Sequence, residues 1–123
     1  MPTAPLPTAR LNLPWSVGVH ELLCQALRER RPLRAQYGGT PVVLWPYALG
    51  RRAGLLYVRG LMVGGPFRDE HWIFIRDLRQ ARLAEPGGWV APGTNPIPAL
   101  DFFDRVEAAC EEYLAWLHRR REN

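Results

Sequence analysis

The longest apolar run in this chain decides its fold: Leu55-Leu56-Tyr57-Val58-Arg59-Gly60-Leu61-Met62-Val63. Gly54 precedes the run and Gly64-Gly65-Pro66 follows it, so the run is too short and too closely bounded by glycine for a helix. Leu and Val dominate it, as is usual for a strand that is buried. We therefore predict a buried central strand over residues 55–63.

Side chains alternate between the two faces of a strand, so the run also predicts two unlike faces. One face is wholly apolar and carries Leu56, Val58, Gly60 and Met62. The other face carries Leu55, Tyr57, Arg59, Leu61 and Val63, which places a phenol beside a guanidinium group. This second face is the first place to look for function.

Four further strands are predicted around the central one. Gly38-Gly39 joins the β-prone runs 33–37 and 42–45, and a Gly-Gly pair supplies the positive φ that tight hairpin turns require. Pro46 is expected to close the second strand. Residues 71–76 and 80–84 are predicted as the fourth and fifth strands, with one helical turn between them. Five short strands with tight links indicate a small, strongly bent sheet or barrel.

A helix is predicted on each side of these strands. The first begins at Ser16, a candidate cap, and ends near Arg31, because Pro32 prevents its continuation. The second spans residues 99–121 and is long. Its apolar stripe consists of Phe103, Val106, Cys110, Tyr113, Leu114 and Leu117. The predicted fold class is therefore mainly β with flanking helices.

Composition divides the chain into four stretches of one domain. Residues 1–15 hold four prolines and are expected to form an extended arm. The first helix and the β module occupy residues 16–84. A linker rich in Pro and Gly follows over residues 85–98, and the helix 99–121 is expected to pack on the same domain. At 123 residues the chain is long enough to bury one core.

Charge and hydropathy bound the possible partners. The net charge is +4, and all sixteen basic residues are Arg, which binds phosphate and carboxylate groups in a bidentate manner. Bias of a GC-rich genome toward Arg codons explains the same composition. No stretch approaches the roughly 18 apolar residues of a membrane span, and the N-terminus lacks the pattern of a secretory signal. We expect a cytoplasmic protein without a membrane partner.

The order of these elements resembles the WYL domain of bacterial regulators over about Leu22 to Leu83. Members of that family show an Ala-Ile helix end, a Tyr that closes strand one, a Pro that closes strand two, and the Trp-Tyr-Leu triplet. Ala26-Leu27, Tyr37, Pro46 and Tyr57 stand at those places. The resemblance implies a five-stranded Sm-like or SH3-like barrel that senses a ligand or a nucleic acid.

The chain departs from the family pattern in two motifs. Leu56 and Val58 replace the Trp and Leu of the triplet. In the later motif, His71 stands where the family has its first Arg, and Arg76-Asp77 inverts an Asp-Arg pair. Only 15 residues precede Ser16, too few for the DNA-binding module that usually accompanies the family. We therefore expect a divergent, stand-alone member.

The alternation of side chains also predicts a candidate site. If Ile73 and Ile75 point inward, the aromatic and basic residues between them share the outer face of the central strand. Aromatic residues interleaved with Arg are typical of grooves for single-stranded nucleic acid. The predicted binding residues are Tyr57, Arg59, His71, Trp72, Phe74, Arg76 and Arg82. In the alternative interpretation, the first or last helix covers this face and makes it a second core.

Little in the sequence indicates catalysis or metal binding. His20 and Cys24 lie four residues apart on one helix, but a zinc site needs at least three protein ligands. Ser16 is the only serine and is read as a helix cap. Cys24 and Cys110 are expected to be small buried hydrophobes, unless the two helices bring them within bonding range. We predict no enzyme activity, no metal and no cofactor.

Two functions follow as hypotheses. The first is a non-enzymatic, WYL-like regulatory module that binds single-stranded nucleic acid or a small anionic effector on the outer face. The second is an assembly subunit, either a homodimer or the partner of a separate regulator. It would act through the C-terminal helix, whose apolar stripe is wider than a core-facing band of about 100°.

Overall fold

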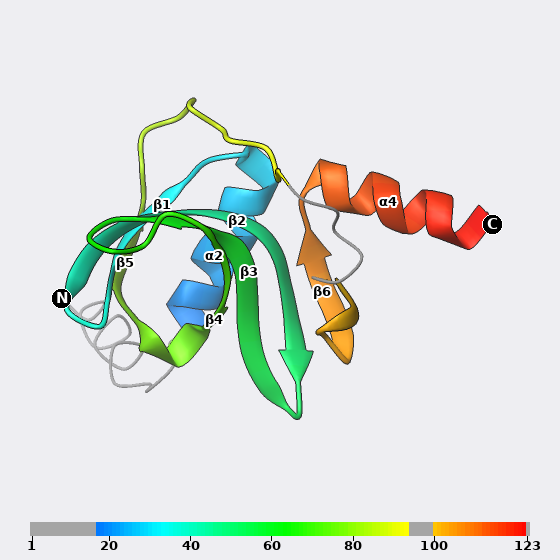
Figure 1. The fold of residues 1–123 in the computed structure, drawn as a ribbon, viewed down its shortest axis with the longest axis horizontal. Coiled ribbons are helices and arrows are strands. Elements are labelled where there is room, and N and C mark those ends of the chain that lie inside the picture. The colour runs from blue at the N-terminus through cyan, green and yellow to red at the C-terminus, as the bar shows by residue number, and fades with distance from the viewer. Residues whose placement is uncertain (1–16, 94–99, 123) are drawn as a thin grey trace, which may run out of the picture.

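The computed structural model describes residues 17–93 and 100–122 as a mainly β protein with an antiparallel open sheet (Figure 1). Its strands are β1 (Leu33–Tyr37), β2 (Thr40–Arg52), β3 (Leu55–Val63), β4 (Glu70–Phe74), β5 (Leu78–Leu83) and β6 (Arg105–Ala109). The helices are α2 (Val17–Glu29), the 3-10 turn η1 (Ile75–Asp77) and α4 (Glu111–Glu122). In this described part, no helix has the length and apolar character needed to cross a membrane.

Some predicted boundaries lie outside the described residues. These are the extended arm 1–15, the cap at Ser16 and the part of the linker beyond residue 93. The described part of the linker, residues 85–93, contains neither helix nor strand.

Strand β2 organises the sheet, whose order is β4-β3-β2-β1-β5 with β6 also paired to β2. One edge of β2 pairs with β3 along most of its length. The other edge pairs first with β1, up to Leu44, and then with β6, from Ala48 onward. Pro46 lies between the part of β2 that pairs with β1 and the part that pairs with β6. No strand pairs with that edge at Pro46, so its missing N–H costs no hydrogen bond between strands. The prediction that Pro46 ends the second strand is wrong for this reason.

The other strand predictions are largely confirmed. Gly38 and Gly39 have φ angles of 58° and 81°, so the hairpin turn uses the predicted glycine conformation. β3 has the predicted bounds. The helical turn comes at residues 75–77 rather than 77–79, and β5 accordingly begins two residues earlier than predicted.

The prediction of one helix over residues 99–121 is wrong. Among the described residues of this range, 100–101 are helical, after which the chain forms β6 and enters α4 only at Glu111. Asp104 anchors the start of β6, because its carboxylate accepts a hydrogen bond from the N–H of Ala53 at 2.7 Å and its own N–H donates to the carbonyl of Arg51 at 2.8 Å. Pairing with a free strand edge thus outweighs the helical spacing of Val106 and Cys110.

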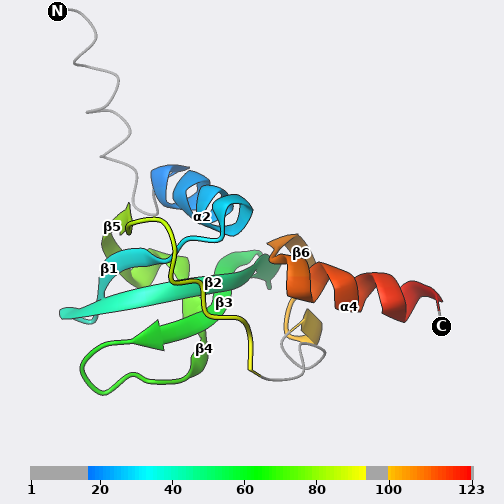
Figure 2. The ribbon, with the colours of Figure 1, turned by 90° about the horizontal axis from the view of Figure 1, so that it is seen from above.

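The core lies between α2 and the concave side of the bent sheet (Figure 2). α2 contributes Leu23, Ala26 and Leu27, all buried. The sheet contributes Leu33, Leu44, Val58, Met62 and Ile73, and η1 contributes Ile75, each at most 1% exposed. This set includes the isoleucines predicted to point inward, so the face of β3 and β4 that carries Arg59 and Trp72 lies on the other side.

Candidate functional site

Pairing of β3 with β4 brings four of the predicted site residues together. Arg59 lies opposite Trp72, and Tyr57 lies opposite Phe74. The guanidinium carbon of Arg59 is 4.1 Å from the centroid of the Trp72 ring. The ring centroids of Tyr57 and Phe74 are 5.4 Å apart. These four side chains share one face, as the alternation predicts.

Phe102, which was expected in a helix, joins this face. Its ring stacks on Trp72 with centroids 5.0 Å apart and 28° between the ring planes. The guanidinium carbon of Arg52 lies 4.5 Å from the Phe102 centroid. Arg59, Trp72, Phe102 and Arg52 therefore form a chain of contacts, here called the aromatic–arginine stack. Its rings already make stacking contacts within the protein, which reduces the ring surface left for nucleic acid bases.

Arg59 does not lie on an open face. Its residue is 9% exposed, and its Nη2 donates to Oε1 of Glu70 at 3.4 Å. The other carboxylate oxygen of Glu70 accepts a hydrogen bond from the N–H of Gly93 at 3.0 Å. Trp72, Phe102 and the linker segment 85–93 therefore cover Arg59, whereas the alternative interpretation expected the first or last helix to cover this face.

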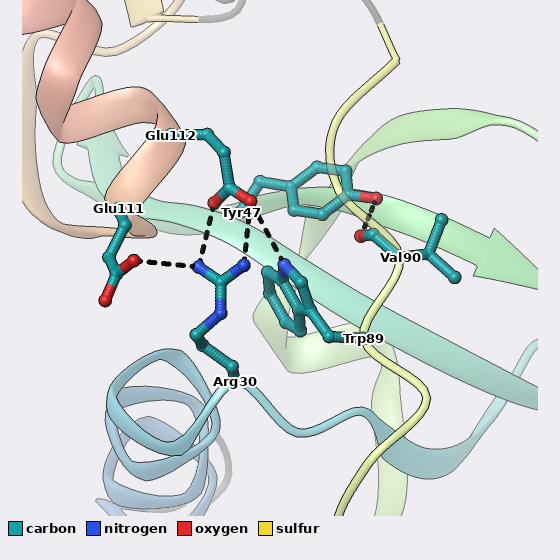
Figure 3. Close-up of polar contacts among 6 residues, drawn as sticks. All are labelled: Arg30, Tyr47, Trp89, Val90, Glu111 and Glu112. Atoms are coloured by element: carbon teal, nitrogen blue, oxygen red, sulfur yellow. Dashed lines mark hydrogen bonds and ion pairs between the residues drawn. The ribbon is translucent and has the colours of Figure 1, made fainter.

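A polar clamp joins this linker segment to the helices (Figure 3). Glu112 accepts hydrogen bonds from Arg30 at 3.1 and 2.9 Å and from the indole N–H of Trp89 at 3.3 Å. The hydroxyl of Tyr47 donates to the carbonyl of Val90 at 2.7 Å. Burial raises the pKa of Glu112, but the hydrogen bonds from Arg30, from the backbone and from Trp89 outweigh burial and lower it to about 2. The clamp has a structural role, because its charges are paired.

The other three predicted site residues lie elsewhere. His71 is on the opposite face of β4, where its ring centroid is 5.9 Å from that of Phe67. Arg76 is exposed and belongs to η1. Arg82 is exposed on β5, opposite Arg34 of β1. The sheet therefore separates His71 from the aromatic–arginine stack, whereas Arg76 and Arg82 lie beyond the ring and cation contacts that form the stack.

Arg76 lines a pocket at the end of the β2–β3 hairpin, with a volume of about 250 Å³. The lining residues are Arg51, Gly54, Leu55, Leu56, Phe74, Ile75 and Arg76. Two of them are cationic, none is acidic, and the remainder are apolar or glycine. Such a lining suits a small anion that carries an apolar body.

The two arginines of this pocket differ in their pairing. Arg51 donates from Nε to Glu107 at 2.7 Å, whereas Arg76 forms no ion pair with any residue that the structure describes. Burial raises the pKa of Glu107, but hydrogen bonds from Arg51 and His20 outweigh burial and lower it. Sequence reasoning missed Arg51 as a site residue. The available signal was the pair Arg51-Arg52 at the tip of a hairpin.

His20, Cys24 and Glu107 form a second polar group. Nδ1 of His20 is 3.9 Å from the sulfur of Cys24, and Nε2 is 3.3 Å from Glu107. Burial raises the pKa of the Cys24 thiol, which disfavours the thiolate that a nucleophile requires. Cys24 and Cys110 are both free thiols. Over residues 17–93 and 100–122, no three His, Cys, Asp or Glu side chains are grouped so as to hold a metal ion.

Comparison with known proteins found no matching family model, no similar curated protein and no similar solved structure.

Proposed function

We propose that this chain is a non-enzymatic, WYL-like regulatory module whose small Sm-like or SH3-like barrel binds a small anionic effector. The strand order supports a barrel, because β4 and β5 are the two ends of the path β4-β3-β2-β1-β5. Only the three residues of η1 separate these end strands. Such a short link keeps Phe74 and Leu78 within about 14 Å of each other, so the sheet bends toward closure there.

Arg76 is the observation that carries the proposal. Its guanidinium group is exposed, has no ion pair within the described residues, and lines a pocket with Leu55, Leu56 and Phe74. An uncompensated guanidinium beside apolar walls favours a carboxylate or phosphate with a short apolar body. Single-stranded nucleic acid has less support, because the aromatic rings of the neighbouring face stack within the chain.

Thermal-shift measurements with a panel of small aromatic and aliphatic carboxylates test this proposal. Binding should raise the melting temperature of the wild type but not of Arg76→Gln. Arg68→Gln is the matched control, since Arg68 is also exposed and unpaired among the described residues but lies outside the pocket. A shift that persists in Arg76→Gln would contradict the assigned pocket.

A fluorescence titration with a short single-stranded oligonucleotide at two salt concentrations tests the nucleic acid alternative. The effector proposal predicts no salt-sensitive binding. Binding that weakens steeply with salt and is lost in Trp72→Ala would favour nucleic acid instead.

Assembly through the C-terminal helix is the second candidate function. α4 extends away from the sheet (Figure 1), and Leu114 on this helix is 51% exposed. Leu114 is the side chain through which we expect this helix to contact a second chain. Sedimentation velocity at increasing concentration should then show a dimer for the wild type and a monomer for Leu114→Asp. A wild type that stays monomeric would exclude self-association.

A further inference from the structure

One row of side chains runs across four strands of the sheet and changes from charged to apolar. Arg82 of β5 lies opposite Arg34 of β1, Arg34 lies opposite Val43 of β2, and Val43 lies opposite Val63 of β3. Residues opposite each other in antiparallel strands share a face of the sheet. These four residues, here called the Arg–Val row, therefore present two guanidinium groups at one end and two valines at the other.

The Arg–Val row lies in a cavity of about 350 Å³. The cavity is also lined by Ala35, Gln36, Pro41, Val42, Gly64 and Gln80. None of its lining residues is acidic, and two side-chain amides accompany the two guanidinium groups. It shares no lining residue with the Arg76 pocket, so it is a separate candidate site.

The guanidinium groups of this cavity have no compensating carboxylate among the residues that the structure describes. Arg34 and Arg82 form no ion pair with a described residue, whereas Arg30, Arg51 and Arg59 each pair with a carboxylate. Cα atoms of opposed residues lie about 5 Å apart, and like charges placed in this way destabilise a sheet. An external anion would relieve this repulsion.

A β-bulge contributes to the same cavity. The pairing of β1 with β5 shifts register between Arg34 and Gln36, and Gln80 of β5 has a φ of 53°. Bulges redirect side chains at sheet edges and beside binding sites. Gln80 lines the cavity together with Gln36, so its amide is available as a further hydrogen-bond donor.

We propose that this cavity binds a phosphomonoester. Its dianionic head group lies over Arg34 and Arg82, and its apolar body lies over Val43 and Val63. The two negative charges of the ligand match the two guanidinium groups, which bind phosphate oxygens in a bidentate manner. The valine end of the row distinguishes an ester with an apolar body from inorganic phosphate.

Isothermal titration calorimetry at low ionic strength, with phenyl phosphate and inorganic phosphate as probes, tests the site. Phenyl phosphate should bind the wild type about tenfold more tightly than inorganic phosphate does, because its ring is buried on the valines. Arg34→Gln and Arg82→Gln should each weaken phenyl phosphate about tenfold or more. Val43→Thr keeps the side-chain shape and should reduce the preference for phenyl phosphate while leaving inorganic phosphate unchanged.

Two control variants separate this site from general charge and from the Arg76 pocket. Arg68→Gln should bind phenyl phosphate as the wild type does, and Arg76→Gln should retain the binding that depends on Arg34 and Arg82. Without ligand, Arg34→Gln should melt at the same temperature as the wild type or higher, since a repulsion is removed. Unchanged binding in Arg34→Gln, or an equal loss in Arg68→Gln, would overturn the proposal.

Two oligonucleotides that differ only in a 5′-phosphate or 5′-hydroxyl group identify the source of the ligand. Preference for the phosphorylated strand indicates a nucleic acid end. Binding of phenyl phosphate alone indicates a free phosphomonoester, and both results support the site. Equal binding of the two strands without binding of phenyl phosphate would show contact with the nucleic acid backbone and would overturn the proposal.

Discussion

Two buried tyrosines differ in a single hydrogen bond. Tyr47 and Tyr113 are both 0% exposed, but only the hydroxyl of Tyr47 has a partner among the described residues, the carbonyl of Val90. Tyr47→Phe should therefore lower the free energy of unfolding by about 1 kcal/mol. Tyr113→Phe should cause no loss. Urea denaturation measures both, and equal losses would contradict this assignment of the hydrogen bonds.

Two arginines near the candidate site should respond in opposite ways to truncation. Arg59 is buried against Glu70, and both side chains are 11% exposed. Arg59→Ala therefore removes the ion-pair partner of a buried carboxylate. A loss of about 3 kcal/mol is expected. Arg76 is exposed and unpaired within the described residues, so Arg76→Ala should change stability by less than about 0.5 kcal/mol.

Denaturation of the double variant Arg59→Met with Glu70→Gln provides the control for the buried pair. It should be more stable than Arg59→Ala, because neither charge is left without its partner. A steep loss for Arg76→Ala would show that this side chain supports the fold and would remove it as an open binding residue.

Contact between β2 and β6 depends on a glycine. A Cβ atom on Gly50 would lie 2.5 Å from the carbonyl oxygen of Arg105 and 2.6 Å from the ring of Phe103. Gly50→Ala should therefore displace this segment and cost about 1 to 3 kcal/mol. Gly93→Ala is the control, since the nearest atom, Oε2 of Glu70, would lie 4.0 Å from its Cβ. Denaturation followed by tryptophan fluorescence compares the two, and equal stabilities would refute the close contact.

The clamp around Glu112 makes the contribution of α4 to the stability of the fold depend on pH. The pKa of Glu112 is lowered from 4.5 to about 2 in the folded protein, despite the opposing effect of burial, because Arg30, the backbone and Trp89 hydrogen-bond to its carboxylate. A lowered pKa contributes stability above pH 4.5, and this contribution is lost as the pH falls toward 2.

Glu112→Gln should therefore be less stable than the wild type at pH 7, and the difference should diminish between pH 4.5 and 2. Urea denaturation at pH 7, 4.5 and 2.5 measures this difference. A constant difference over that range would show that ionisation of Glu112 does not contribute.

Local patterns predicted the elements whose pairing is local. The Gly38-Gly39 turn and the apolar run of β3 determine a hairpin and a strand without help from distant residues. β6 could not be predicted in the same way, because Val106 and Cys110 also fit helical spacing. Its conformation depends on the free edge of β2, which is distant in sequence. The prediction that Pro46 ends the second strand was wrong for the same reason, since the tertiary fold determines which strands pair with that edge of β2.

Only the part of the candidate site that follows from the alternation of side chains along paired strands could be predicted from the sequence. Tyr57 and Phe74 meet because β3 and β4 form an antiparallel pair. The burial of Arg59 was not predictable from β3 alone, since Phe102 and the segment 85–93 belong to connections whose course no local pattern fixes. The place of Arg76 depended on a shift of the helical turn by two residues.

The whole described molecule should unfold as one cooperative unit. Tyr47 of β2 contacts both Trp89 of the linker and Tyr113 of α4, with ring centroids 5.8 and 5.9 Å apart. These contacts couple the C-terminal elements to the sheet. Thermal melts followed by far-UV circular dichroism and by tryptophan fluorescence should coincide. An earlier transition in fluorescence alone would show that the C-terminal part detaches first.

The division of the β2 edge between β1 and β6 has a consequence for biosynthesis. Arg51 is translated 54 residues before its partner Arg105. At about 5 to 20 residues per second, this half of the β2 edge therefore remains unpaired for about 3 to 11 seconds. Throughout that interval its backbone groups are open to strands of other nascent chains. Ribosome-bound chains that stop before β6 should therefore depend on chaperones, and chains that extend past Ala109 should no longer need them.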